Sequence, residues 1–159
     1  MKITVVAVGK IKEKYFREAI EEYARRLSRF CRLELIEVAD EKTPEGAGAA
    51  REEQIREKEE MRILQKLPPG SYVTALAIDG RTMDSVELSG WMERQNVEGI
   101  SHMTFVIGGS LGLSAGVLKR ADFRLSFSRM TFPHQLMRVI LLEQIYRSYM
   151  IRSGAPYHK

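Results

Sequence analysis

Residues 104–113 read Thr-Phe-Val-Ile-Gly-Gly-Ser-Leu-Gly-Leu, and residues 123–134 read Phe-Arg-Leu-Ser-Phe-Ser-Arg-Met-Thr-Phe-Pro-His. Each segment starts with an apolar run of strand length and then breaks into a loop, the first at Gly108 and the second at Ser128. Pro133 then opens a long helix, because proline suits the first helical turn. Open α/β sheets bind ligands where parallel strands end, so the two loops predict a binding site at one edge of a sheet.

Three glycines, Gly108, Gly109 and Gly112, give the first loop its character. Their spacing matches neither the Rossmann fingerprint Gly-x-Gly-x-x-Gly nor the phosphate-binding P-loop, which requires a lysine after its last glycine. Glycine allows the backbone to turn sharply and to approach a ligand closely, since no Cβ intrudes. The glycines alone therefore fit either a tight turn between a strand and a helix or a loop that contacts a ligand.

Strands and helices alternate along the rest of the chain. Predicted strands cover Lys2–Gly9, Leu33–Val38, Tyr72–Ile78, Met103–Ile107 and Phe123–Phe127, and predicted helices cover Glu13–Phe30, Arg51–Leu67, a segment that starts at Asp84, Ser114–Arg120 and Pro133–Arg152. Asp79-Gly80 is expected to turn the chain out of the third strand. The alternation predicts an α/β fold with a mostly parallel sheet flanked by helices, and the length predicts a single domain over residues 1–159.

The last predicted helix is apolar around most of its circumference. Its apolar residues are Leu136, Met137, Val139, Ile140, Leu141, Leu142, Ile145, Tyr146, Tyr149, Met150 and Ile151. A domain of this size has one interior, so such a helix should pack against its own sheet on one side and against another surface on the other. Closed dimers are the commonest assemblies, and the sequence therefore predicts a homodimer.

The composition excludes several classes of protein. Cys31 is the only cysteine, which rules out an internal disulfide and a multi-cysteine metal site. No apolar run approaches the length of a membrane span, and Ile3–Val8 is too short for a secretory core. We therefore expect a cytoplasmic protein that needs neither a membrane nor a metal.

Basic residues are concentrated in the last third of the chain. Residues 119–159 contain eight Lys or Arg residues and two acids, Asp122 and Glu143, so eight minus two gives this segment +6, whereas the whole chain carries +4. Such asymmetry suggests a polyanionic partner. The alternative is that these basic residues are scattered over a solvated surface.

Several motifs taken together closely resemble the RlmH family. They are the opening Lys2–Lys10, the glycine segment Phe105–Leu113, the segment Leu125–His134, the helical Glu143–Arg147 and the terminal Pro156–Lys159. The resemblance covers the whole chain. RlmH proteins are SPOUT-class methyltransferases that use S-adenosylmethionine to methylate N3 of pseudouridine 1915 in bacterial 23S rRNA. The resemblance implies this activity, in the context of the assembled ribosome, together with a homodimer and a SPOUT-type α/β-knot with a C-terminal trefoil knot.

The resemblance also implies which residues hold S-adenosylmethionine. They are Leu76 at the end of the third predicted strand, Gly108, and the loop residues Phe127, Ser128, Arg129, Met130, Thr131 and Phe132. The cofactor carries an activated methyl group, so the reaction needs no metal but needs an apolar slot for adenine and backbone groups at its edge. Without the resemblance, Leu76 is interpreted as an ordinary core residue.

The acceptor is a ring imide N–H, which becomes a good nucleophile only when its proton leaves. His158 is the candidate base because histidine titrates near neutrality, Tyr157 is a candidate to stack on the base, and Arg147 is a candidate to face the RNA or the active site.

Each of these residues also has a structural interpretation. The tail Ala155–Lys159 is expected to fray if it covers no site, and Arg147 follows Glu143 at the spacing of an intrahelical ion pair. His134 is interpreted as structural, because it follows Pro133 at the start of a helix. The alternative function is a non-catalytic rRNA-binding or ribosome-associated module.

Overall fold

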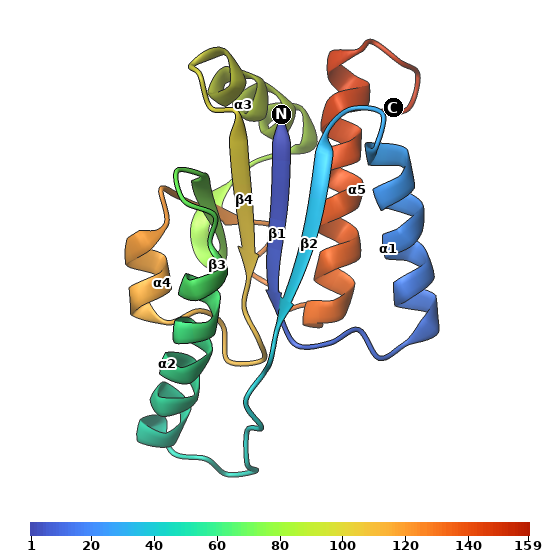
Figure 1. Cartoon of the computed structure of the whole chain (residues 1–159). Helices are drawn as coiled ribbons and strands as arrows, with labels where there is room; N and C mark the ends of the chain where they lie inside the picture. The colour runs from blue at the N-terminus through green and yellow to red at the C-terminus, as the bar shows by residue number, and fades with distance from the viewer.

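The computed structural model describes all residues from Met1 to Lys159, along which five strands alternate with five helices (Figure 1). In chain order the elements are β1 (Lys2–Val8), α1 (Lys14–Leu27), β2 (Arg32–Val38), α2 (Ala49–Lys66), β3 (Tyr72–Thr82), α3 (Ser85–Val97), β4 (His102–Ile107), α4 (Ala115–Arg120), β5 (Phe123–Ser126) and α5 (His134–Arg152). Every strand and helix expected from the sequence is present.

All five strands form one parallel sheet with the order β2-β1-β4-β3-β5. The prediction of a mostly parallel sheet flanked by helices is confirmed. Parallel strands point the same way, so their carboxyl ends meet along one edge, at the bottom of Figure 1, which we call the carboxyl edge. The loops after β4 and β5 both leave the sheet at this edge.

Helices cover both faces of the sheet, which makes three layers. Residues of α1, α3 and α5 pack on one face in an apolar cluster of 16 buried residues, and α2 and α4 pack on the other face in a cluster of 7. The interior strand β1 alternates between the two clusters, with Val5 and Ala7 in the first and Val6 and Val8 in the second. A strand buried on both faces needs apolar side chains at nearly every position, which explains the apolar run at the start of the chain.

The third strand is longer than the sequence predicts. β3 continues to Thr82, and its pairing with β5 skips from Leu76 to Arg81, which leaves the residues between them as an irregularity in the sheet. The prediction that Asp79-Gly80 ends the strand is wrong, because an Asp-Gly pair serves a bulge as well as a turn. A Cβ on Gly80 would lie 2.7 Å from the backbone of β5, so glycine is required for this close approach.

One side of α5 faces the interior. Leu141, Leu142 and Ile145 are buried in the core, and α1 and α3 both pack against the helix. Leu136 and Ile140 remain partly exposed in the single chain. The apolar surface that prompted the prediction of a homodimer is therefore present, and the homodimer itself stays a prediction.

Candidate functional site

The loops after β4 and β5 meet at the carboxyl edge and enclose a cavity of about 250 Å³, which we call the edge cavity. Seven of the eight residues predicted to hold the cofactor line it: Leu76, Gly108, Phe127, Ser128, Met130, Thr131 and Phe132. The eighth, Arg129, belongs to the same loop but is exposed and lies outside the lining. The structure thus brings the predicted cofactor residues together, and their binding role stays a prediction.

Two backbone segments touch at Gly108, which is why a glycine is required there. A Cβ on Gly108 would lie 2.8 Å from the carbonyl carbon of Gly112, closer than real Cβ atoms approach. Gly112 adopts a φ of 80°, in the left-handed region that favours glycine, and its N–H donates to the Gly109 carbonyl over 3.0 Å. Because these glycines line the edge cavity, an occupant meets backbone groups on this side.

Serine side chains hold the loop Phe127–Phe132. Ser126 Oγ donates to the carbonyl of Ser128 over 3.2 Å, and the N–H of Met130 donates to Ser128 Oγ over 2.9 Å. The two phenylalanines of the loop are partly buried and line the edge cavity. The loop therefore combines a fixed backbone with apolar walls.

His134, the first residue of α5, also lines the edge cavity. The sequence interpretation treated this residue as structural. Burial lowers the pKa of the imidazole and the positive charge of Arg138 lowers it further, so the ring is neutral at pH 7. The one sequence signal for its place in the lining is its position two residues after Phe132.

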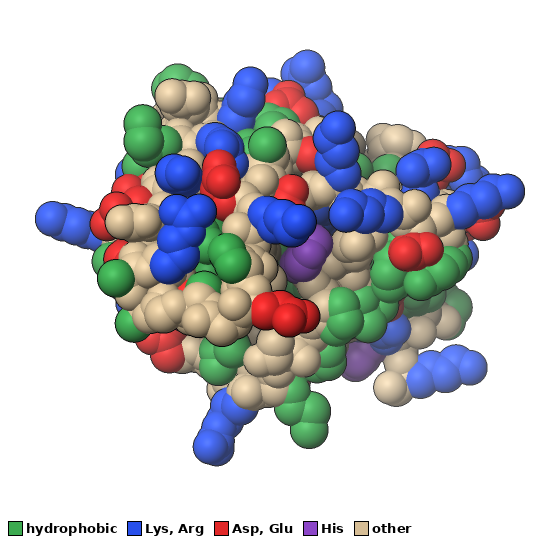
Figure 2. Space-filling view, turned by 90° about the horizontal axis from the view of Figure 1, so that it is seen from below, with side chains coloured by type: hydrophobic (Ala, Val, Ile, Leu, Met, Phe, Trp, Pro, Cys, Tyr) green, Lys and Arg blue, Asp and Glu red, His purple; other side chains and the backbone are tan.

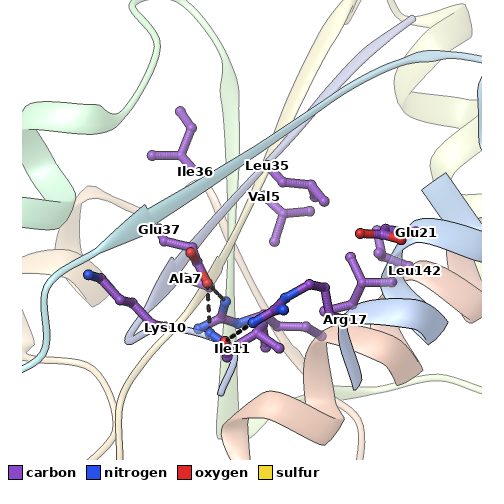
Figure 3. Close-up of a pocket in the computed structure, with 12 residues that line it drawn as sticks. Val5, Ala7, Lys10, Ile11, Arg17, Glu21, Leu35, Ile36, Glu37 and Leu142 are labelled. Atoms are coloured by element: carbon purple, nitrogen blue, oxygen red, sulfur yellow. Dashed lines mark hydrogen bonds and ion pairs between the residues drawn. The ribbon is translucent and has the colours of Figure 1, made fainter. Parts of the chain in front are cut away.

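Arg138, one turn after His134, is buried, and both terminal nitrogens of its guanidinium donate hydrogen bonds to the protein, whereas its Nε has no partner. Its guanidinium donates to the carbonyls of Val8 and Gly9 over 3.0 and 2.6 Å, and to the carboxylate of Glu37 over 2.6 Å. The same carboxylate accepts the N–H of Ile11 over 3.0 Å, as Figure 3 shows. This network ties the end of β1 to the start of α5, next to the edge cavity.

A second and larger cavity, of about 460 Å³, lies between α1, α5 and the β1–β2 side of the sheet (Figure 3). Its walls include Val5, Leu35 and Leu142, and Lys10 and Arg17 also line it. No residue of the loops after β4 and β5 reaches this cavity. Parallel sheets bind ligands among the loops at their carboxyl ends, so the edge cavity is the candidate cofactor site despite its smaller volume.

The three predicted catalytic residues, Arg147, Tyr157 and His158, gather with Glu143 along the second half of α5, in a group that we call the tail cluster. Glu143 accepts hydrogen bonds from Arg147 over 2.6 Å and from the Tyr157 hydroxyl over 3.1 Å, and Arg147 donates to His158 Nδ1 over 3.1 Å. The Arg147 guanidinium also lies 4.8 Å from the centroid of the Tyr157 ring. The tail is therefore packed on α5 through specific contacts, and the Glu143–Arg147 ion pair is part of them.

The tail cluster and the edge cavity are far apart within one chain. An α-helix rises about 1.5 Å per residue, so Arg147 lies roughly 20 Å along α5 from His134. Figure 1 shows the same separation, because the C-terminus lies at the top whereas the strands end at the bottom. The cofactor residues and the catalytic residues predicted from the sequence do not form a common site in a single chain.

The basic residues of the last third do not form one free patch. Three of them are paired with carboxylates: Arg120, Arg138 and Arg147. Other basic side chains are exposed near the carboxyl edge, including Lys10 and Lys12 after β1 and Arg129 after β5. Figure 2 looks onto this end of the molecule, where Lys and Arg side chains are spread among hydrophobic ones.

No group of three or more His, Cys, Asp or Glu side chains is placed to hold a metal ion. None of the helices combines the length and the apolar character that crossing a membrane requires.

Comparison with known proteins identifies the family. A family model described as a predicted SPOUT methyltransferase matches residues 1–158. The chain is 57% identical to the ribosomal RNA large subunit methyltransferase H of Bifidobacterium adolescentis and 58% identical to the protein of that name from Clostridioides difficile, over 100% of both chains in each case. Among solved structures, a probable methylase family protein from Haemophilus influenzae matches with a TM-score of 0.48 and 11% identity, over 96% of this chain and 66% of that one. The chain belongs to the RlmH family of SPOUT methyltransferases.

Proposed function

We propose that this protein transfers a methyl group from S-adenosylmethionine to N3 of pseudouridine 1915 in bacterial 23S rRNA, within the assembled ribosome. The observation that carries the proposal is the edge cavity, which gathers seven of the eight residues expected to hold the cofactor. The names of the full-length relatives, ribosomal RNA large subunit methyltransferase H, support large-subunit rRNA as the substrate.

The edge cavity fits the cofactor chemically. Leu76 and Phe127 offer apolar surface for adenine, and Gly108 allows backbone groups to approach its edge. When bound, the cofactor supplies a methyl group activated by its sulfonium. A volume of about 250 Å³ lies below the roughly 300–1,000 Å³ of typical small-molecule pockets, which fits a ligand that stays partly open to a bulky RNA acceptor.

A second copy of the chain completes the site in this proposal. Within one chain, Arg147 lies roughly 20 Å along α5 from His134 of the edge cavity, so in this proposal the tail cluster serves the reaction from the partner subunit. The partly exposed apolar side of α5, with Leu136 and Ile140, is the surface available for a homodimer. The C-terminal trefoil knot implied by the family resemblance would hold the loops after β4 and β5 together.

Three residues of the tail cluster then have a role in the reaction. Tyr157 offers an aromatic face to the target base, and Arg147 stabilises the negative charge that develops as N3 loses its proton. His158 accepts that proton on Nδ1, the nitrogen that accepts a hydrogen bond from Arg147 in the free chain. Lys10 and Arg129, exposed near the carboxyl edge, contact phosphates and provide sequence-independent affinity.

Ribosomes from cells that lack the protein are the substrate for a direct test. Purified protein with labelled S-adenosylmethionine should methylate them, and mass spectrometry should map the methyl group to N3 of the pseudouridine. Calorimetry should detect cofactor binding in the absence of RNA. Binding without transfer to any ribosomal particle would contradict the substrate, whereas no binding at saturating cofactor would favour the non-catalytic rRNA-binding module.

Two defective variants test the shared site. G108A is designed to lose the cofactor, and a chain that ends at Ala155 lacks Tyr157 and His158. If sites are shared, a mixed dimer contains one site with both defects and one intact site, so it should recover about half of the wild-type activity. Inactive mixed dimers, formed from variants that both fold and dimerise, would show that the whole site lies within one chain.

A further inference from the structure

His134 is the only ionisable side chain in the lining of the edge cavity. All other lining residues are glycine, apolar, or carry a hydroxyl group, so His134 also offers the only side-chain nitrogen there. Both molecules expected in the cavity bring oxygen atoms with negative charge. The cofactor has a carboxylate, and an imide oxygen of the target base becomes anionic when N3 loses its proton. No Lys or Arg of the lining is available to either oxygen.

The imidazole ring is held on the side that faces the backbone of Gly9. A Cβ on Gly9 would lie 3.3 Å from Cε1 of His134 and 3.8 Å from its Nδ1. Gly9 adopts a φ of 93° and has no side chain, so the ring packs directly on the backbone. Arg138 donates to the carbonyl of Gly9 and fixes this backbone in turn.

The surroundings of Nδ1 determine where the ring carries its proton. Nδ1 is buried and has no hydrogen-bond partner. A proton there would be a buried donor without an acceptor, and it would lie near the Arg138 cation, which is unfavourable on both counts. A lone pair on Nδ1 is favoured by the same cation. The neutral ring therefore carries its proton on Nε2, the nitrogen that is not buried without a partner.

We propose that His134 is a binding residue of the edge cavity, and that its Nε2–H donates a hydrogen bond to an anionic oxygen of the cofactor or of the target base. The inference rests on the proposed function, because that function brings these two molecules into the cavity. The carboxylate of the cofactor and the imide oxygen of the base share the required chemistry, and ligands that lack one of them distinguish the two sources.

The experiment measures the affinities of S-adenosylhomocysteine and methylthioadenosine, which share adenosine and sulfur but differ in the carboxylate. If His134 binds the carboxylate, H134F should lose about tenfold or more in affinity for S-adenosylhomocysteine and keep its affinity for methylthioadenosine. If His134 binds the imide oxygen, both affinities should be kept, and the single-turnover rate of ribosome methylation at saturating cofactor should fall about tenfold or more. H134Q keeps an N–H near the position of Nε2, so its loss of affinity or of rate should be smaller than that of H134F in either case.

His102 provides the matched control, because it is half-buried at the start of β4 and pairs with Thr4 Oγ1 over 2.8 Å, outside the edge cavity. H102F should leave both affinities and the rate unchanged, and H134A replaces H134F if phenylalanine disturbs folding. Nitrogen NMR of the wild-type imidazole should report a proton on Nε2. Equal loss of both ligands, no change in affinity or rate, or a proton on Nδ1 would overturn the proposal. A wild-type protein that binds neither ligand and methylates no ribosome would overturn the proposed function as well.

Discussion

Replacing Arg138 with methionine (R138M) tests the connection between β1 and α5. The side chain is 6% exposed, and its guanidinium donates to the carbonyls of Val8 and Gly9 and to the carboxylate of Glu37. Methionine is long and flexible enough to fill much of the same space, but it has no donor. Both carbonyls then lose a charged hydrogen-bond partner in buried surroundings.

The expected loss of stability follows from these contacts. A hydrogen bond to a charged group contributes about 1.5–3 kcal/mol, so two carbonyl bonds give about 3–6 kcal/mol. Removing one partner from a buried ion pair costs about 3–5 kcal/mol, which lies within this range, and we expect a loss of that size. Glu37 is 44% exposed, so water replaces much of its ion pair, and that contact adds less than about 1 kcal/mol. For a chain of 159 residues, a loss of about 3–5 kcal/mol corresponds to a decrease in Tm of roughly 6–20 °C.

Urea denaturation followed by circular dichroism measures the free energy of unfolding, and one fixed protein concentration is used because the stability of a dimer, if one forms, depends on concentration. R120M is the matched control, since Arg120 pairs with Asp122 at the surface over 3.5 Å and should contribute less than about 1 kcal/mol. If R138M unfolds within about 1 kcal/mol of the wild type, the argument for this network is refuted.

Three further predictions concern the loops, α2 and the tail cluster. G108A should lose cofactor binding in calorimetry because its Cβ would meet the backbone of Gly112, whereas G90A, with nothing within 4 Å of its Cβ, should bind normally; binding by G108A would contradict the loop geometry. Burial raises the pKa of Glu59 above 4.5, so its stabilising contribution is present below the unfolded pKa and lost as pH rises through the folded pKa. E59Q should therefore be more stable than the wild type at neutral pH and lose this advantage below about pH 4. If urea denaturation shows a difference in stability that does not vary with pH, the raised pKa of Glu59 is contradicted. Burial and the charge of Glu143 raise the pKa of Tyr157 to about 12, so the difference in ultraviolet titration between wild type and Y157F should appear near that pH, and a difference centred near the ordinary tyrosine value would disprove the contact.

The position of the edge cavity could be predicted from local sequence, but the order of the strands could not. Gly108 and the loop Phe127–Phe132 each follow an apolar run, and parallel strands end at a common edge. The pairing of β3 with both β4 and β5 depends on contacts between segments distant in the chain. The hydrophobic pattern within one segment does not indicate which strand will be its neighbour. Asp79-Gly80 shows the same limit locally, because the dipeptide is compatible with a turn and with the irregular pairing that the neighbouring strand imposes.

The histidines show why the site could be predicted only in part. His158 was chosen for its chemistry and His134 was set aside for its place at a helix start, but His134 lines the edge cavity and His158 accepts a hydrogen bond from Arg147. The chemical character of a side chain is visible in sequence. Whether a histidine of α5 or of the tail lies at the carboxyl edge or at the opposite end depends on the direction in which α5 runs along the sheet.

The length of α5 separates the packed tail from the edge cavity of the same chain. Its 19 residues span about 28 Å, and the helix starts at the edge cavity and ends at the tail. Seven residues, Ser153–Lys159, follow the helix, and fully extended they would reach at most about 25 Å. To reach its own cavity, His158 would have to give up its contacts on α5 and extend nearly the full length of the tail. If His158 takes part in the reaction while the tail stays packed on α5, it acts on the cavity of another molecule, and the contacts of Tyr157 with Glu143 and Tyr146 keep the tail in that packed position.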